Sequence, residues 1–179
     1  EISCSLVGSE MCIRDSNMVV PRNQYINSTN IAVDSSINFY LSKAAKLNTK
    51  LSLSIAVPPD IFVSDLDISI TLGNLLSNAI EALEKLQDDT ERKLSVSILY
   101  KMSTLYLEIK NTFSGSLKKI DKVTFKSTKK DSRNHGYGLS NVNEVVEKYD
   151  GISSFTTEGN WFIVNITLFS EKKNSQLQE

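Results

Sequence analysis

Five short segments of the chain are predicted to be strands, and in the clearest of them apolar and polar residues alternate, a spacing typical of strands with one buried face. The segment LSLSIAV shows this alternation most clearly. Four of the segments form two pairs, separated by the short sequences KMS and EGN, so we expect two hairpins. The predicted strands are 51–57, 94–100, 104–110, 152–157 and 161–169.

Three other segments carry apolar residues three or four positions apart, the spacing of one helix face. The first helix is expected to follow a short apolar strand at 31–33, with Asp34 or Ser35 as its N-cap. Asp67 is expected to cap the second helix, and Gly151 to cap the C-terminus of the third. The predicted core positions are Ile37, Tyr40, Leu41, Ala44, Ala45 and Leu47, then Leu72, Leu75, Leu76, Ala79, Leu83 and Leu86, then Leu139, Val142, Val145, Val146 and Tyr149.

The predicted order is strand, helix, strand, helix, hairpin, a long polar segment, helix and hairpin. Three helices that cover one face of a mixed sheet make a two-layer α/β sandwich. We assign this domain to residues 31–170, with 17–30 as a linker remnant and 171–179 as a polar tail. The polar segment, 111–135, is expected to have little regular structure.

The first 16 residues, EISCSLVGSEMCIRDS, have no helical or strand period and do not begin with Met. They resemble a translated adapter sequence that occurs at the ends of unrelated proteins, so we exclude them from fold reasoning. The chain is then expected to be a fragment whose upstream sequence is missing. The exclusion removes both cysteines, Cys4 and Cys12, which would make neither a disulfide framework nor a zinc site.

Composition narrows the class of protein. Of 179 residues, 40% are hydrophobic and 23% charged, and the net charge is -1, which is typical of a soluble globular domain. The net charge is not strongly basic, so we expect no nucleic acid partner. The apolar runs are far shorter than the ~18 residues of a membrane span, so we expect no membrane contact by this domain. Because no disulfide framework is expected, a reducing cytoplasm is the simplest location for this domain.

Two asparagines one turn apart, Asn74 and Asn78, interrupt an otherwise good helix former and share a side with Glu81. One interpretation is a solvated polar face. The other is a metal and phosphate site. Mg²⁺ prefers hard oxygen ligands, which an amide oxygen supplies, while the amide NH₂ group can donate to phosphate.

Gly136 and Gly138 precede the third helix, where backbone N–H groups can approach an anion. They do not belong to a Walker A motif. They also do not match a Rossmann fingerprint, because Asn141 occupies the position of its third glycine. A plain turn into the helix is the alternative. The polar segment before them is long enough to be a lid. Its cations, solvated or phosphate-binding, are Lys118, Lys119, Lys122, Lys126, Lys129, Lys130 and Arg133.

Lys129 is the cation of that group that we expect to touch phosphate, because it lies nearest the glycines. Asn111 ends a predicted strand where the polar segment begins. Its amide oxygen could accept a hydrogen bond from the exocyclic amine of a base. Alternatively, Asn111 is a turn residue that ends the strand.

Taken together, these motifs resemble those of the GHKL ATPases, which include gyrase-type topoisomerases and histidine kinases. The sequence LGNLLSNAIEAL resembles the family's N-box, HGYGLSNV its G2 box, and IKNTF lies where the G1 box belongs. The order and spacing fit from about Ser28 to Phe169. The chain most resembles the catalytic domains of peptide-sensing, quorum-type histidine kinases from Gram-positive bacteria.

The resemblance implies the Bergerat α/β sandwich, with ATP and Mg²⁺ between the asparagine helix and the lid. Asn78 matches the family's Mg²⁺ ligand. Asn74 lies where gyrase-type members carry a general-base Glu, so autonomous hydrolysis is not expected. Gly136, Gly138 and Leu139 belong to the matched nucleotide-binding box. At the G1 box, family members often have Asp and glycines, but here Thr112 and Phe113 follow Asn111, which predicts modest affinity for ATP.

The implied activity is that of an ATP-dependent protein histidine kinase. The γ-phosphoryl of ATP would pass to a histidine on a dimerisation helix missing from this chain, because the only histidine, His135, lies in the lid. The parent is expected to be a homodimer in the bacterial plasma membrane, with this domain in the cytoplasm and a response regulator as partner. The alternatives are an anti-sigma-factor-type serine kinase and a non-catalytic nucleotide-binding module.

Overall fold

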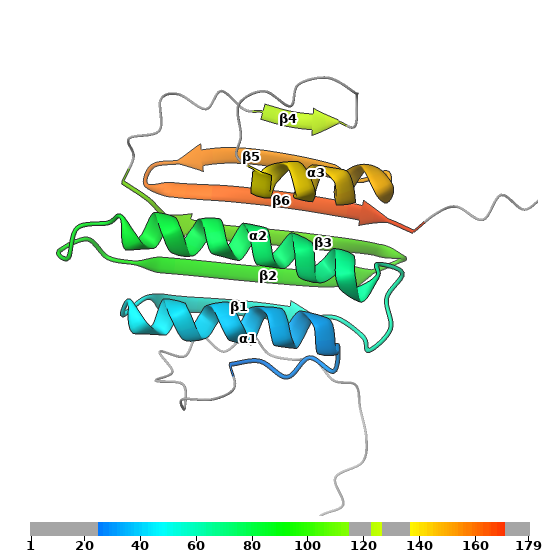
Figure 1. Cartoon of the computed structure of the whole chain (residues 1–179), viewed down its shortest axis with the longest axis horizontal. Coiled ribbons are helices and arrows are strands. Elements are labelled where there is room, and N and C mark those ends of the chain that lie inside the picture. The colour runs from blue at the N-terminus through cyan, green and yellow to red at the C-terminus, as the bar shows by residue number, and fades with distance from the viewer. Residues whose placement is uncertain (1–24, 115–122, 127–136, 171–179) are drawn as a thin grey trace, which may run out of the picture.

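The computed structural model describes residues 25–114, 123–126 and 137–170. They form three helices and one six-stranded sheet with the strand order β1-β2-β3-β6-β5-β4 (Figure 1). β1 pairs in parallel with β2, and every other neighbouring pair is antiparallel. In chain order the elements are α1 (Ile31–Lys46), β1 (Lys50–Ala56), α2 (Asp65–Glu84), β2 (Lys93–Lys101), β3 (Thr104–Thr112), β4 (Val123–Lys126), α3 (Tyr137–Lys148), β5 (Ile152–Glu158) and β6 (Trp161–Phe169).

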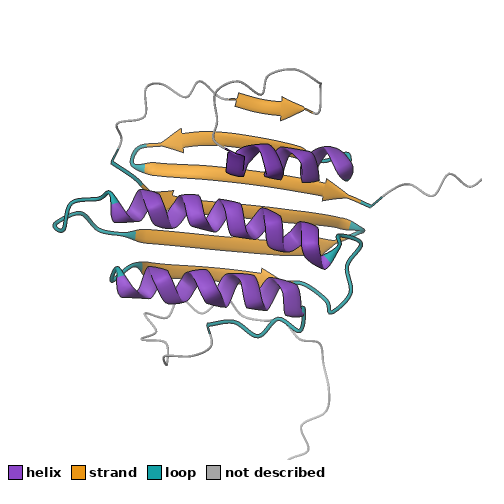
Figure 2. Ribbon diagram, in the orientation of Figure 1, coloured by secondary structure: helices purple, strands orange, loops and turns teal. Residues whose placement is uncertain are grey.

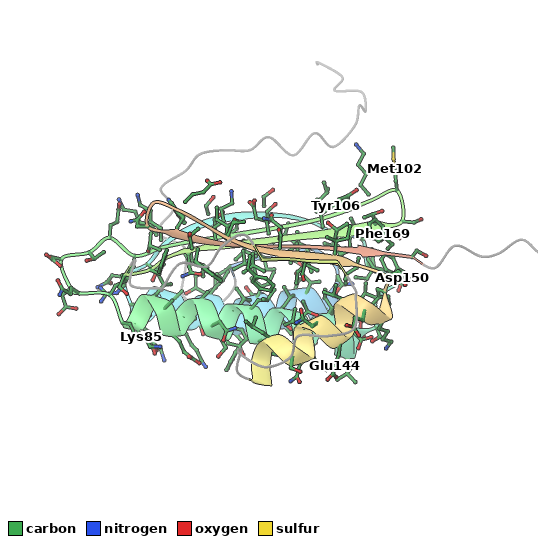
Figure 3. All side chains as sticks on the ribbon, turned by 90° about the horizontal axis from the view of Figure 1, so that it is seen from above. Lys85, Met102, Tyr106, Glu144, Asp150 and Phe169 are labelled. Carbon is green, nitrogen blue, oxygen red and sulfur yellow. The ribbon has the colours of Figure 1, made fainter. Side chains whose placement is uncertain are left out.

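The three helices lie on one face of the sheet (Figures 2 and 3), so the prediction of a two-layer α/β sandwich is confirmed. The core lies between the layers, and each fully buried Leu or Ile there stabilises the fold by about 1.5–3 kcal/mol. The predicted stripe of α2, from Leu72 to Leu86, is buried throughout. Tyr106 lies on the opposite face of the sheet, away from the helices, and is 45% exposed (Figure 3).

Both predicted N-caps of the first two helices are wrong. α1 begins at Ile31, so 31–33 is a helical turn rather than a strand, and its cap is Asn30. The Asn30 side chain accepts from the Val33 N–H at 3.0 Å and donates to the Pro59 carbonyl at 2.9 Å. The second contact lies 29 residues away, so the tertiary structure selects this cap over Asp34 or Ser35. The cap of α2 is Ser64, and Asp67 lies inside the helix.

The polar segment 111–135 contains more regular structure than predicted. β3 extends to Thr112, and β4 pairs with β5 as a short edge strand. Four residues are too few for alternation to distinguish a strand from a loop, and such a strand forms through main-chain pairing with its neighbour. The rest of this segment, 115–122 and 127–136, lies outside the described residues.

The two hairpins are confirmed, with shorter turns than predicted. Lys101 pairs with Thr104, which leaves Met102 and Ser103 as the two turn residues, with φ of 49° and 55°. Positive φ at both positions is typical of a type I′ turn, whose twist matches that of the strands. The second turn contains Gly159, with φ of 59°.

The C-terminus of α3 is a Schellman motif in which the residue roles differ from those predicted. The Gly151 N–H donates to the Val146 carbonyl at 2.7 Å, and the Asp150 N–H donates to the Glu147 carbonyl at 3.2 Å. The residue with the left-handed conformation is Asp150, with φ of 48°, and not Gly151. Gly151 is instead confined by the close approach of β6.

Candidate functional site

α2 and α3 pack side by side and run antiparallel (Figure 1). Figure 3 labels Lys85, which follows α2, and Asp150, which follows α3, at opposite ends of the helix layer. The N-terminus of α2 therefore lies near the C-terminus of α3, and the C-terminal half of α2 lies near the N-terminus of α3. The two ends of this helix pair carry different chemistry.

At the first end, the carboxylate of Asp67 is surrounded by donors. Its Oδ2 accepts hydrogen bonds from Lys148 Nζ, Tyr149 OH and Ser64 Oγ, each at 2.6 Å. The Tyr149 OH in turn accepts from the Ser64 N–H at 3.0 Å. The Asp67 side chain is only 10% exposed. We call Ser64, Asp67, Lys148 and Tyr149 the α2–α3 latch.

The sequence did not predict this latch. It indicated Asp67 only as a cap, because the two partners from α3 lie 81 and 82 residues further along the chain. Burial raises the pKa of Asp67, but the hydrogen bonds from Lys148, Ser64 and Tyr149 outweigh burial and lower the pKa from 3.8 to about 2. The ionised carboxylate therefore stabilises the folded state.

We expect the stability contributed by Asp67 to depend on pH. Because the folded pKa is depressed, this contribution is complete above the unfolded pKa of 3.8 and is lost as the pH falls through about 2. The shift corresponds to about 2 kcal/mol. Urea unfolding of the wild type and Asp67→Asn at pH 6 and at pH 2 measures it. The difference between the two proteins should shrink by about this amount, and a difference independent of pH would contradict the assignment.

At the other end of the helix pair lie the asparagines. Eleven residues, three turns and about 20° of rotation, separate Asp67 from Asn78, so both face the α3 side of α2. Asn78 is exposed. Asn74 is half-buried, and its Nδ2 donates to the Ile70 carbonyl at 2.8 Å, which leaves its oxygen for another donor or a cation. Glu81 points to solvent.

Gly138 lies in the first turn of α3, eleven residues before Tyr149. Since Tyr149 contacts Asp67 and the helices are antiparallel, the backbone at Gly138 is level with Asn78. A helix N-terminus presents free N–H groups and a positive dipole end to an anion. Leu139 is partly buried and packs against the core. Gly136, Lys129 and His135 lie outside the described residues.

Asn111 is 3% exposed and lies in β3, so it is a strand residue rather than a turn residue. It lies two residues after the buried Ile109, so both side chains face the same side of the sheet, the side that the helices cover. It pairs with Leu94 of β2. Its Nδ2 donates to the Thr112 carbonyl at 3.0 Å, so the amide orientation directs Oδ1 away from that bond.

The residues that fit a magnesium–phosphate group are amides and backbone N–H groups. The described part of the chain holds no cluster of three or more His, Cys, Asp or Glu side chains that could bind a metal. Mg²⁺ often needs only one or two protein oxygens, because phosphate and water complete its shell. The exposed amide of Asn78, level with a helix N-terminus, meets this requirement.

The fold is a two-layer sandwich in which α2 carries the two asparagines and α3 has Gly138 in its first turn. Comparison with known families identifies this class of domain. The GHKL domain model matches residues 63–169, and the chain belongs to this family. The search of curated proteins gave no match. No helix in the described ranges is long and apolar enough to span a membrane.

Solved structures of similar fold include histidine kinases. AdeS of Acinetobacter baumannii shares 17% identity over 79% of this chain, with a TM-score of 0.56, and the match spans 64% of the AdeS chain. The catalytic domain of histidine kinase ThkA shares 14% identity over 77% of this chain and 90% of its own, with a TM-score of 0.58. The mycobacterial sensor histidine kinase MprB shares 14% over 77% and 93%, with a TM-score of 0.54. At these identities the likeness shows the fold alone.

Proposed function

We propose that this chain is the ATP-binding catalytic domain of a sensor histidine kinase. It would transfer the γ-phosphoryl of Mg-ATP to a histidine on a dimerisation helix of the same parent protein. The observation that carries the proposal is the register of the helix pair, in which Asn78 lies level with the N-terminus of α3 at Gly138. This register supports a site in which an amide oxygen and the backbone donors of a helix N-terminus would bind one metal-bound triphosphate.

Each residue has a distinct role in the proposal. Mg²⁺, when bound, would supply the positive charge that neutralises the phosphates. Asn78 would hold the metal through Oδ1, and Asn74 would support it from the previous turn. The N–H groups around Gly136 and Gly138 would bind phosphate, with Lys129 as the covering cation. Leu139 would stabilise the base of this turn through its contact with the core.

The amides favour transfer over hydrolysis. A carboxamide cannot remove a proton from water, so Asn74 cannot act as the general base that hydrolysis needs. An imidazole acceptor is itself the nucleophile. Transfer to it requires only that the site hold the phosphate in line and stabilise its charge. The proposed site can do both without a general base.

Asn111 would read the base. Its Nδ2 is already engaged by the Thr112 carbonyl, so Oδ1 is the atom left to accept from the exocyclic amine of adenine. Guanine presents a carbonyl at that position, which would face another acceptor. Because a neutral acceptor makes a weaker hydrogen bond than a carboxylate, we infer modest affinity with retained preference for ATP over GTP.

The experiment that tests the function is in two stages. Binding is measured by calorimetry with ATP and GTP, each with and without Mg²⁺, and we expect Mg²⁺-dependent binding that favours ATP. Labelled ATP is then supplied with the dimerisation helix of the parent kinase. Acid-labile label on that helix supports the proposal. Label on serine instead would indicate a serine kinase, and binding without transfer would indicate a non-catalytic module.

The parent protein extends the proposal. We infer a homodimeric, peptide-sensing receptor in the bacterial plasma membrane, with this domain in the cytoplasm and a response regulator that accepts the phosphoryl group. The motif resemblance to the quorum-type branch supports this inference. Recovery of the coding sequence upstream of Asn17, with membrane spans and a histidine-bearing helix, would test it directly.

A further inference from the structure

We propose that Asp67 is a positioning residue for the nucleotide site. In this proposal, the α2–α3 latch sets the register between the two helices and so keeps the N-terminus of α3 opposite Asn78. The inference rests on the proposed function for its nucleotide readout. It assigns a role in ATP binding to a carboxylate about 16 Å along α2 from the metal-binding amide.

The latch joins the two helices at one point. Three donors converge on one carboxylate oxygen, and two of them, Lys148 and Tyr149, come from the end of α3. Tyr149 OH also accepts from the Ser64 N–H, so it contacts the cap of α2 as well as Asp67. The contact therefore fixes α3 both along and around the axis of α2.

The same end of α3 is also fixed to the sheet. The Phe169 N–H of β6 donates to the Tyr149 carbonyl at 3.2 Å, and Gly151 lies against the backbone of β6. The N-terminal end of α3 carries Gly138 instead. The two contacts at the C-terminal end therefore set the register of the helix, while Leu139 and Val142 hold its other half against the core.

The length of α3 amplifies small changes at the latch. Its 12 residues span about 18 Å, so a tilt of about 5° at the latch moves the far end by about 1.5 Å. A displacement of about 1 Å in a positioned reactant can reduce a rate a hundredfold. We therefore expect loss of the carboxylate at the latch to weaken phosphate binding at Gly138.

The surroundings of Asp67 distinguish it from an ordinary surface ion pair. The Asp67 side chain is 10% exposed, whereas both side chains of the Lys110–Glu108 pair are 35% exposed. The Lys148 side chain is 58% exposed, so what distinguishes Asp67 is its own burial, because removing its charge leaves the converging donors without their acceptor. The Lys110–Glu108 pair belongs to β3 and lies away from the helix boundary, which makes Glu108→Gln a matched control for Asp67→Asn.

The first test compares Mg-ATP dissociation constants for the wild type, Asp67→Asn, Tyr149→Phe and Glu108→Gln, at a temperature where all four are folded by circular dichroism. We expect about tenfold weaker binding in Asp67→Asn and a smaller loss in Tyr149→Phe, with Glu108→Gln unchanged. Lys148→Arg, which keeps a charged donor, should retain wild-type affinity. Destabilised Asp67→Asn that binds Mg-ATP like the wild type would overturn the proposal.

A second measurement needs no nucleotide. Spin labels at Glu81→Cys on α2 and Glu144→Cys on α3, both exposed, report the distance between the helices after Cys4 and Cys12 are replaced by Ser. Asp67→Asn should shift or broaden this distance, and Glu108→Gln should not. An unchanged distance would overturn the positioning role. Failure of the wild type to bind Mg-ATP, with the shift still present, would overturn the kinase assignment alone.

Discussion

Asn78→Ala is expected to weaken Mg-ATP binding by about a hundredfold while the fold remains intact. The substitution removes a metal ligand and a phosphate donor together, and polar contacts to charged groups are worth about 1.5–3 kcal/mol each. Asn78 is exposed, so no packing is lost, and alanine is the better helix former. Calorimetric titration gives the affinity, and urea unfolding should show equal or slightly higher stability.

Glu81→Ala provides the control for this prediction. Glu81 lies three residues further along the same helix, is also exposed, and has no role in the proposed metal site. Its replacement removes a polar group of similar size from the same helix and should leave the dissociation constant unchanged. If Asn78→Ala bound Mg-ATP as tightly as the wild type, the metal site would have to lie elsewhere. Asn78→Asp separates metal binding from phosphate binding, because it keeps an oxygen ligand but removes the donor.

The core of this fold could be predicted because periodicity is a local property. A helix stripe such as Leu72, Leu75 and Leu76 repeats within one turn, and the buried face follows from that spacing alone. The alternation in β1 and in both hairpins is equally local. These patterns determine which side of each helix and each strand is buried, and burying those sides against one another gives the two layers.

The caps could not be predicted in the same way because long-range contacts select them. Several residues near the start of α1 have side chains able to cap a helix, and Asn30 is selected by its additional bond to Pro59. Asp67 resembles a cap in sequence, yet Lys148 and Tyr149 surround its carboxylate in the fold. Nothing within a window of a few residues around either position contains this information.

The candidate site could be predicted in part, less completely than the core and more completely than the caps. The asparagine pair and the glycines stand out locally, as residues that a plain helix or turn does not need. Their mutual placement depends on the antiparallel packing of α2 and α3, which the latch makes visible. The roles of Asn74, Asn78, Asn111, Gly138 and Leu139 remain proposals, as do those of Gly136 and Lys129 beyond the described residues.

Gly151→Ala is expected to destabilise the fold by about 3 kcal/mol. A Cβ atom at this position would lie 2.6 Å from the Thr167 carbonyl oxygen and 3.1 Å from that of Val146. Both are backbone atoms, one in β6 and one in α3, so relief requires that the helix end and the strand move apart. Overpacking of this kind commonly costs about 1–3 kcal/mol, and here no flexible side chain can absorb it. Urea unfolding measures the loss directly.

Gly73→Ala makes the same chemical change with the opposite expected sign. Its Cβ would meet only the Tyr40 hydroxyl at 3.7 Å, an ordinary contact, and alanine stabilises a helix interior over glycine by about 1 kcal/mol. The two variants therefore separate the effect of close backbone approach from that of glycine itself. Because Gly151 adjoins the anchored end of α3, its variant should also weaken Mg-ATP binding under folding conditions. Equal stability in both variants would show that the close approach of β6 at Gly151 does not confine this helix end.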